Sequence, residues 1–63
     1  MARTNNEYLH GYRMGWEYAE CGGNTHTMVR EILSRGISMR TTYAVAFMNA
    51  VKDCKAGRPK KYD

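Results

Sequence analysis

The clearest pattern of apolar positions lies in the last third of the chain. Apolar side chains recur there at the spacing of one helix face, namely Met39, Tyr43, Ala46, Phe47, Ala50, Val51 and Cys54. Ser38 stands directly before this stretch and is a favourable helix N-cap residue. The pattern predicts a helix over residues 39–56, followed by Gly57 and a basic stretch.

A second apolar strip flanks this face and consists of Ala44, Val45 and Met48. One amphipathic face needs only the first set of residues. The additional strip therefore predicts that the helix is covered from two sides, and in so small a chain the second cover is a second copy of the protein. We expect a homodimer through this strip; a broad core face within one monomer is the alternative that stays open.

Two further helices are indicated upstream. Thr4 and Glu7 fit a capping box that starts a helix over residues 5–21, and Gly22 is suited to end it. Its apolar face is formed by Leu9, Tyr12 and Trp16, extended by Tyr8, Gly15 and Ala19. Gly11 and Gly15 are each less favourable than alanine in a helix interior by about 1 kcal/mol. We therefore expect another helix backbone or an aromatic ring to approach them closely.

The second helix is predicted over residues 25–35, with Asn24 or Thr25 as its cap and Gly36 at its end. Its apolar residues are Met28, Val29, Ile32 and Leu33. No segment alternates in the manner of a strand. The sequence thus predicts an all-α fold: a small three-helix domain over residues 1–56 with short Gly-containing turns, and a basic C-terminal tail over residues 57–63.

Length and cysteine content limit the class of protein. A chain of 63 residues is one domain at most, and such a domain buries only about 60% of its unfolded surface. No apolar run is long enough for a membrane span, and residues 1–7 lack the apolar region of a signal peptide. We expect a cytoplasmic protein in which Cys21 and Cys54 are free thiols. A Cys21–Cys54 disulfide, or a zinc site with His10 and His26, is the alternative; we expect no metal and no cofactor.

Charge differs between the two parts of the chain. Residues 1–34 hold three arginines and four glutamates, a net of −1, whereas residues 35–63 hold seven cations and two aspartates, a net of +5. Such asymmetry favours a polyanionic partner.

Residues 28–48 resemble a helix-turn-helix, the motif of many DNA-binding regulators. Two predicted helices are joined by the short Gly-containing turn of residues 35–38. The resemblance implies that the start of the second of these helices enters the major groove of DNA. The groove contacts it implies are Arg35, Arg40, Thr41 and Thr42. An ordinary αα-hairpin without DNA contacts is the alternative.

Residues 57–61 read Gly-Arg-Pro-Lys-Lys and resemble the core of an AT-hook, a basic element that lies in the minor groove of A·T-rich DNA. Proline prevents helix continuation there, and the narrow minor groove attracts arginine. The backbone contacts expected from this part of the chain are Lys55, Arg58, Lys60 and Lys61. A tail that only keeps the protein dissolved is the alternative.

Aromatic residues on the first helix give a rival hypothesis, because such residues are enriched in protein interfaces. The contact surface would consist of Tyr8, Tyr12, Arg13, Trp16 and Tyr18. The short chain with this helix resembles phage-encoded accessory proteins that bind and inhibit or redirect a larger host protein. We find no phosphate loop or nucleophile motif and expect no enzymatic activity. The first expectation is a dimeric DNA-binding protein that regulates transcription by occupancy, without a small-molecule substrate; the second is a protein-binding accessory factor.

Overall fold

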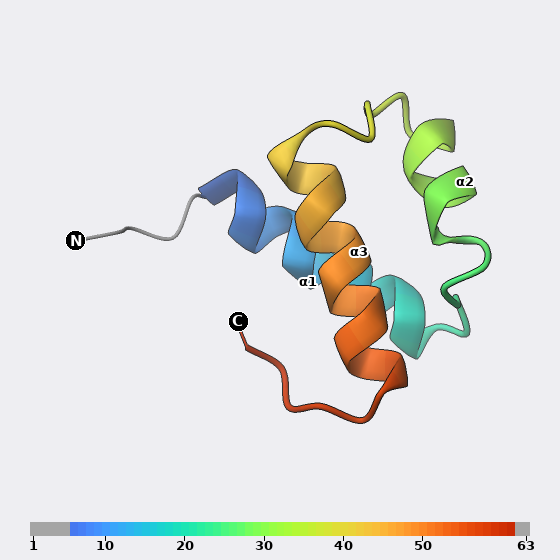
Figure 1. The fold of residues 1–63 in the computed structure, drawn as a ribbon, viewed down its shortest axis with the longest axis vertical. Coiled ribbons are helices and arrows are strands. Elements are labelled where there is room, and N and C mark those ends of the chain that lie inside the picture. The colour runs from blue at the N-terminus through green and yellow to red at the C-terminus, as the bar shows by residue number, and fades with distance from the viewer. Residues whose placement is uncertain (1–5, 62–63) are drawn as a thin grey trace.

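The fold is taken from a computed structural model, which describes residues 6–61 (Figure 1). Three helices form in this range: α1 (Asn6–Glu20), α2 (Met28–Ser34) and α3 (Thr42–Lys55). No strand occurs among the described residues, so the predicted all-α class is confirmed. The predicted second and third helices begin three residues later than expected.

The contact between α1 and α3 organises the molecule, and two glycines make it possible. A Cβ atom added to Gly11 would lie 3.0 Å from the Cα atom of Tyr43, and one added to Gly15 would lie 2.8 Å from the Cα atom of Phe47. The predicted close approach of a helix backbone is therefore confirmed. Successive turns of α1 meet successive turns of α3, so the two helices cross while running in the same sense (Figure 1). The long connection between them carries α2.

The core lies between these two helices and on the side of α3 that α2 covers. Its largest fully buried side chains are Tyr12, Ile32, Phe47 and Val51. Only half of the apolar face predicted for α2 is buried. Met28 and Ile32 enter the core, whereas Val29 and Leu33 remain 39% and 54% exposed, because α2 is short and packs against α3 on one side only.

The start of α3 differs from the prediction. Thr41 is its N-cap, and the Thr41 hydroxyl accepts a hydrogen bond from the Ala44 amide at 3.1 Å. The predicted cap, Ser38, instead accepts from the Arg40 amide in the connection, at 3.2 Å. Both residue types cap helices well, so the local sequence did not distinguish them.

The start of α2 was also predicted too early. The Asn24 side chain accepts from the backbone amides of His26 and Thr27 and so stabilises a turn before the helix. The predicted capping box at the start of the first helix involves Thr4, which lies outside the described residues. Its partner Glu7 accepts a hydrogen bond from the Tyr43 amide at 3.4 Å, which places a carboxylate at the first turn of α3.

The second apolar strip of α3 is only partly available to another molecule. Ala44 is fully buried in the monomer core, and the half-buried Met48 packs against the same core. Val45 alone stays 42% exposed. Ala44 was expected at a dimer interface and cannot form one, because it has no surface left. Dimerisation itself stays a prediction that now depends on Val45. None of the helices in residues 6–61 is long and apolar enough to cross a membrane.

Candidate nucleic-acid interface

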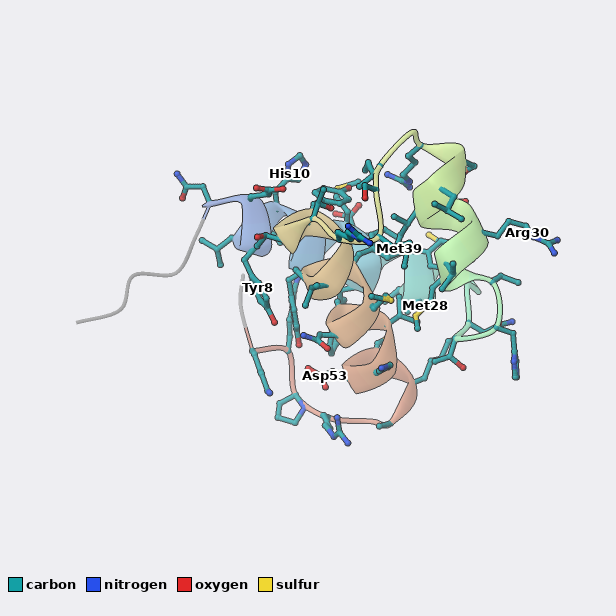
Figure 2. The ribbon with its side chains drawn as sticks, turned by 45° about the horizontal axis from the view of Figure 1, so that its top comes forward. Tyr8, His10, Met28, Arg30, Met39 and Asp53 are labelled. Atoms are coloured by element: carbon teal, nitrogen blue, oxygen red, sulfur yellow. The ribbon has the colours of Figure 1, made fainter. Side chains whose placement is uncertain are left out.

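A buried carboxylate connects the end of α3 to α1 and to the C-terminal segment, residues 57–61. The Asp53 carboxylate accepts a hydrogen bond from the Tyr12 hydroxyl at 2.7 Å and another from the Arg58 guanidinium at 2.8 Å. The Tyr12 hydroxyl in turn accepts from the backbone amide of Lys61 at 3.3 Å. Figure 2 shows Asp53 on the side of α3 to which the C-terminal segment returns. We refer to Tyr12, Asp53, Arg58 and the Lys61 amide as the Asp53 network.

The network shifts the acidity of both groups that titrate at its centre. Hydrogen bonds from Tyr12 and Arg58 stabilise the ionised form and lower the pKa of Asp53 below its ordinary value. Burial, reinforced by the hydrogen bond to Asp53, raises the pKa of Tyr12 to about 12. Asp53 therefore stays ionised and Tyr12 stays neutral at pH values around neutrality.

A reversal of the backbone after α3 brings the C-terminal segment to the Asp53 network. Gly57 has a φ of 77°, and the amides of Gly57 and Arg58 donate to the carbonyls of Cys54 and Asp53 at 3.2 and 2.9 Å. This pair of bonds is a Schellman motif, which reverses the chain at the end of a helix. The segment then turns back toward the middle of the molecule (Figure 1). Its Lys60 ammonium lies 6.0 Å from the centre of the Trp16 ring of α1.

Arg58 is consequently an ion-paired residue. Its side chain is 61% exposed while that of Asp53 is only 6% exposed, so one edge of the guanidinium faces the protein and much of it faces solvent. Insertion of Arg58 into a minor groove, as the AT-hook resemblance implies, requires this ion pair to break. Contact with a phosphate from the exposed edge does not, because a guanidinium carries five N–H donors.

The basic residues expected at the interface fall into two separate groups. Lys55, Arg58, Lys60 and Lys61 are all exposed and gather around the end of α3. The remaining candidates lie in the connection before α3 and at its start: Arg35, Arg40, Thr41 and Thr42. The length of α3 separates the groups, so the structure does not bring all eight residues into one site.

The group at the start of α3 is largely engaged within the protein. The Arg35 guanidinium pairs with Glu31 at 2.9 Å and lies 5.6 Å from the centre of the Phe47 ring. The Thr41 hydroxyl caps α3 and donates to the Ser38 carbonyl at 2.8 Å. Arg40 is exposed and Thr42 is half-buried. The connection between α2 and α3 spans residues 35–41, which is longer than the expected turn of residues 35–38.

The aromatic residues of α1 are mostly used by the fold. Tyr12 is fully buried and therefore cannot belong to a protein-binding surface, contrary to the expectation. The other three rings are half-buried and each has a partner in the chain: Tyr8 accepts from Asn49, Trp16 donates to Glu20, and Tyr18 bonds with Thr27. Arg13 is exposed on the same helix.

Two residues of this region were not singled out from the sequence. Asp53 has the spacing of the apolar face, because it follows Ala46 by seven positions and Ala50 by three. A carboxylate on an apolar face needs a buried partner, and that spacing was the available clue. Lys52 is exposed one turn before the end of α3, and it adds a further cation to the same end of that helix.

The described residues contain neither a disulfide nor a cluster of metal-binding side chains. Cys21 is exposed, Cys54 is half-buried, and both are free thiols. Residues 6–61 contain no group of three or more side chains placed to hold a metal ion. No family model, curated protein or solved structure matches this sequence.

Proposed function

We propose that the protein binds nucleic acid through phosphate contacts made by a basic surface at the end of α3. We define this basic surface as Lys52, Lys55, Arg58, Lys60 and Lys61. The observation that carries the proposal is the distribution of charge. The chain has a net charge of +4, and residues 52–61 alone hold five cations and one aspartate, which is also +4. The other five cations are balanced by five acids.

Anchoring of the C-terminal segment supports this proposal. Ordering a flexible chain upon binding costs free energy, and the Asp53 network holds residues 57–61 against α1 before any ligand arrives. The segment therefore presents its charges from a defined backbone. Because phosphates carry no sequence information, we expect binding that depends weakly on base sequence. The protein would then act by occupying the nucleic acid and not by catalysing a reaction on it.

A contribution from the helix-turn-helix-like region is a separate part of the proposal. Glu7 lies at the first turn of α3, where a phosphate would otherwise be attracted, and Arg40 is the exposed cation nearby. We therefore assign most of the affinity to the basic surface. Arg40→Ala should weaken binding less than Lys60→Ala does.

Titration at two salt concentrations with charge-matched variants tests the proposal. Binding of labelled DNA should fall steeply between about 50 mM and about 200 mM salt. The double variant Lys60→Ala/Lys61→Ala should bind more weakly and reduce the salt slope by about two. The control Arg13→Ala/Arg30→Ala removes the same charge from exposed positions, and Arg30 lies at the far edge of the molecule from Asp53 (Figure 2).

The control double variant should retain nearly all of the affinity. If the wild-type protein binds neither single strands nor duplexes at low salt, the proposal is wrong. Equal losses in the two double variants would show that only total charge matters and would remove the basic surface as the site.

A protein partner is the second candidate, and the exposed apolar residues Val29, Leu33 and Val45 favour it. In that case the chain acts as an accessory factor that inhibits or redirects a larger protein. Apolar contacts respond little to salt, so a partner complex should persist at salt concentrations that abolish binding to phosphates.

A further inference from the structure

The rings of three residues on one side of α1 form a row. Tyr8 and Tyr12 have ring centres 6.4 Å apart with planes inclined by 20°, and Tyr12 and Trp16 follow at 6.1 Å and 23°. Tyr12, in the middle, is fully buried. Tyr8 and Trp16, at the two ends, are only half-buried.

The C-terminal segment crosses this row. The Lys61 amide donates to the Tyr12 hydroxyl, and the Lys60 ammonium lies over Trp16. Lys60 and Lys61 lie more than forty residues after these rings in the sequence. The N-terminal half of the chain, which holds the rings, is slightly acidic. The fold therefore places the positive charge of one end of the chain on the aromatic surface of the other.

Interleaved aromatic rings and cations match the chemistry of a single-stranded nucleic acid. Unpaired bases stack on exposed rings while cations contact the flanking phosphates. Trp16 suits this role, because its indole N–H donates to Glu20 at 3.0 Å and so fixes the orientation of the ring. Lys60 is a flexible side chain that can leave the ring for a phosphate. Bases within a duplex are stacked on one another and do not offer a free face.

We infer that the preferred ligand of the basic surface is single-stranded nucleic acid, with a base stacked on Trp16 and phosphates bound by Lys60 and Lys61. This inference rests on the proposed function and adds the class of ligand. A duplex bound through its phosphates alone is the competing outcome.

Trp16 is the only tryptophan in the chain, so its emission reports directly on the proposed contact. The probes are an oligothymidylate of about 12 nucleotides, a length within the range covered by small single-strand sites, and a mixed-sequence duplex of the same strand length. The full-length protein should bind the single strand more tightly, and its emission should be quenched by that strand and changed little by the duplex.

The variant Trp16→Leu keeps an apolar side chain and removes the ring. Its affinity for the single strand should fall about tenfold, which corresponds to about 1.4 kcal/mol and lies within the range for stacking one base. Its affinity for the duplex should stay within about twofold. Trp16→Phe retains a ring and should recover most of the single-strand affinity, while circular dichroism verifies that both variants are folded.

Equal or tighter binding of the duplex, with unchanged emission on binding the single strand, overturns the inference and leaves the proposed function intact. If neither probe binds at low salt, both are wrong. Should Trp16→Leu fail to fold, the emission of the wild-type protein decides: quenching specific to the single strand supports the contact, and unchanged emission in its complex excludes it.

Discussion

The Tyr12 hydroxyl donates a 2.7 Å hydrogen bond to the Asp53 carboxylate, and 41 positions separate the two residues in sequence. The bond joins the middle of α1 to the end of α3. It also reaches the C-terminal segment, because Asp53 holds Arg58 and Tyr12 holds the Lys61 amide. A single buried carboxylate thus stabilises the helix crossing and positions the basic residues.

Tyr12→Phe should therefore lower stability more than an ordinary hydroxyl deletion. Hydrogen bonds to charged groups contribute about 1.5–3 kcal/mol, and the variant also leaves the Lys61 amide without its partner. We expect the urea midpoint to fall by a corresponding amount. Tyr43→Phe, in a half-buried ring of α3, is the matched control and should change stability by no more than about 0.5 kcal/mol. Equal midpoints for Tyr12→Phe and wild type would contradict the role assigned to the network.

The same two residues predict how stability depends on pH. The pKa of Asp53 is lowered in the folded protein, so below its ordinary value of 3.8 the unfolded chain binds more protons and stability falls as the pH falls. The pKa of Tyr12 is raised from 10.0 to about 12, so above pH 10 the unfolded chain loses a proton first and stability falls as the pH rises through that interval.

Urea midpoints across the pH range check both limits. Asp53→Asn should flatten the acid limb and Tyr12→Phe the alkaline limb, relative to wild type. An acid limb that is identical in wild type and Asp53→Asn would show that other carboxylates cause the acid loss of stability.

The helices and their ends were largely predictable from local sequence, and the contacts between distant residues were not. A glycine with positive φ follows the end of each helix, at Gly22, Gly36 and Gly57. These helix ends depend on local backbone geometry, so they can be read from the sequence. Asp53 was missed as a buried residue because its partners, Tyr12 and Arg58, belong to different segments. The start of α3 was misplaced because Ser38 and Thr41 are both residue types that cap helices well.

The candidate interface was predicted in composition but not in arrangement. The basic residues from Lys55 to Lys61 were selected from their charge and from the resemblance of residues 57–61 to an AT-hook, and neither criterion needs a fold. The position of Lys60 over Trp16 depends on a chain reversal at Gly57 and on the crossing of α1 with α3. Periodicity within one helix carries no information on either feature.

The crossing of α1 and α3 should tolerate no side chain at Gly15. Alanine is more favourable than glycine in a helix by about 1 kcal/mol, but a Cβ here would clash with the Phe47 carbonyl oxygen and would lie 2.8 Å from the Phe47 Cα atom. Overpacking of this kind costs about 1–3 kcal/mol, and backbone yields less readily than a side chain. We expect Gly15→Ala to lower the melting temperature. Arg13→Ala, on the exposed face of the same helix, should leave it nearly unchanged; a stabilised Gly15→Ala variant would show that the helices are not in close contact.

Substitutions at two neighbouring positions of α3 test the predicted homodimer apart from the fold. Val45 is 42% exposed, so Val45→Lys should change monomer stability by no more than about 0.5 kcal/mol. Met48 packs against the core, so Met48→Lys should destabilise the monomer by placing a charge beside apolar side chains.

Sedimentation equilibrium over a range of protein concentrations gives the oligomeric state. If wild type is a dimer and Val45→Lys a folded monomer, the exposed part of the strip forms the interface. If wild type is monomeric at every concentration, the dimer prediction is wrong and the strip serves only the core of one molecule.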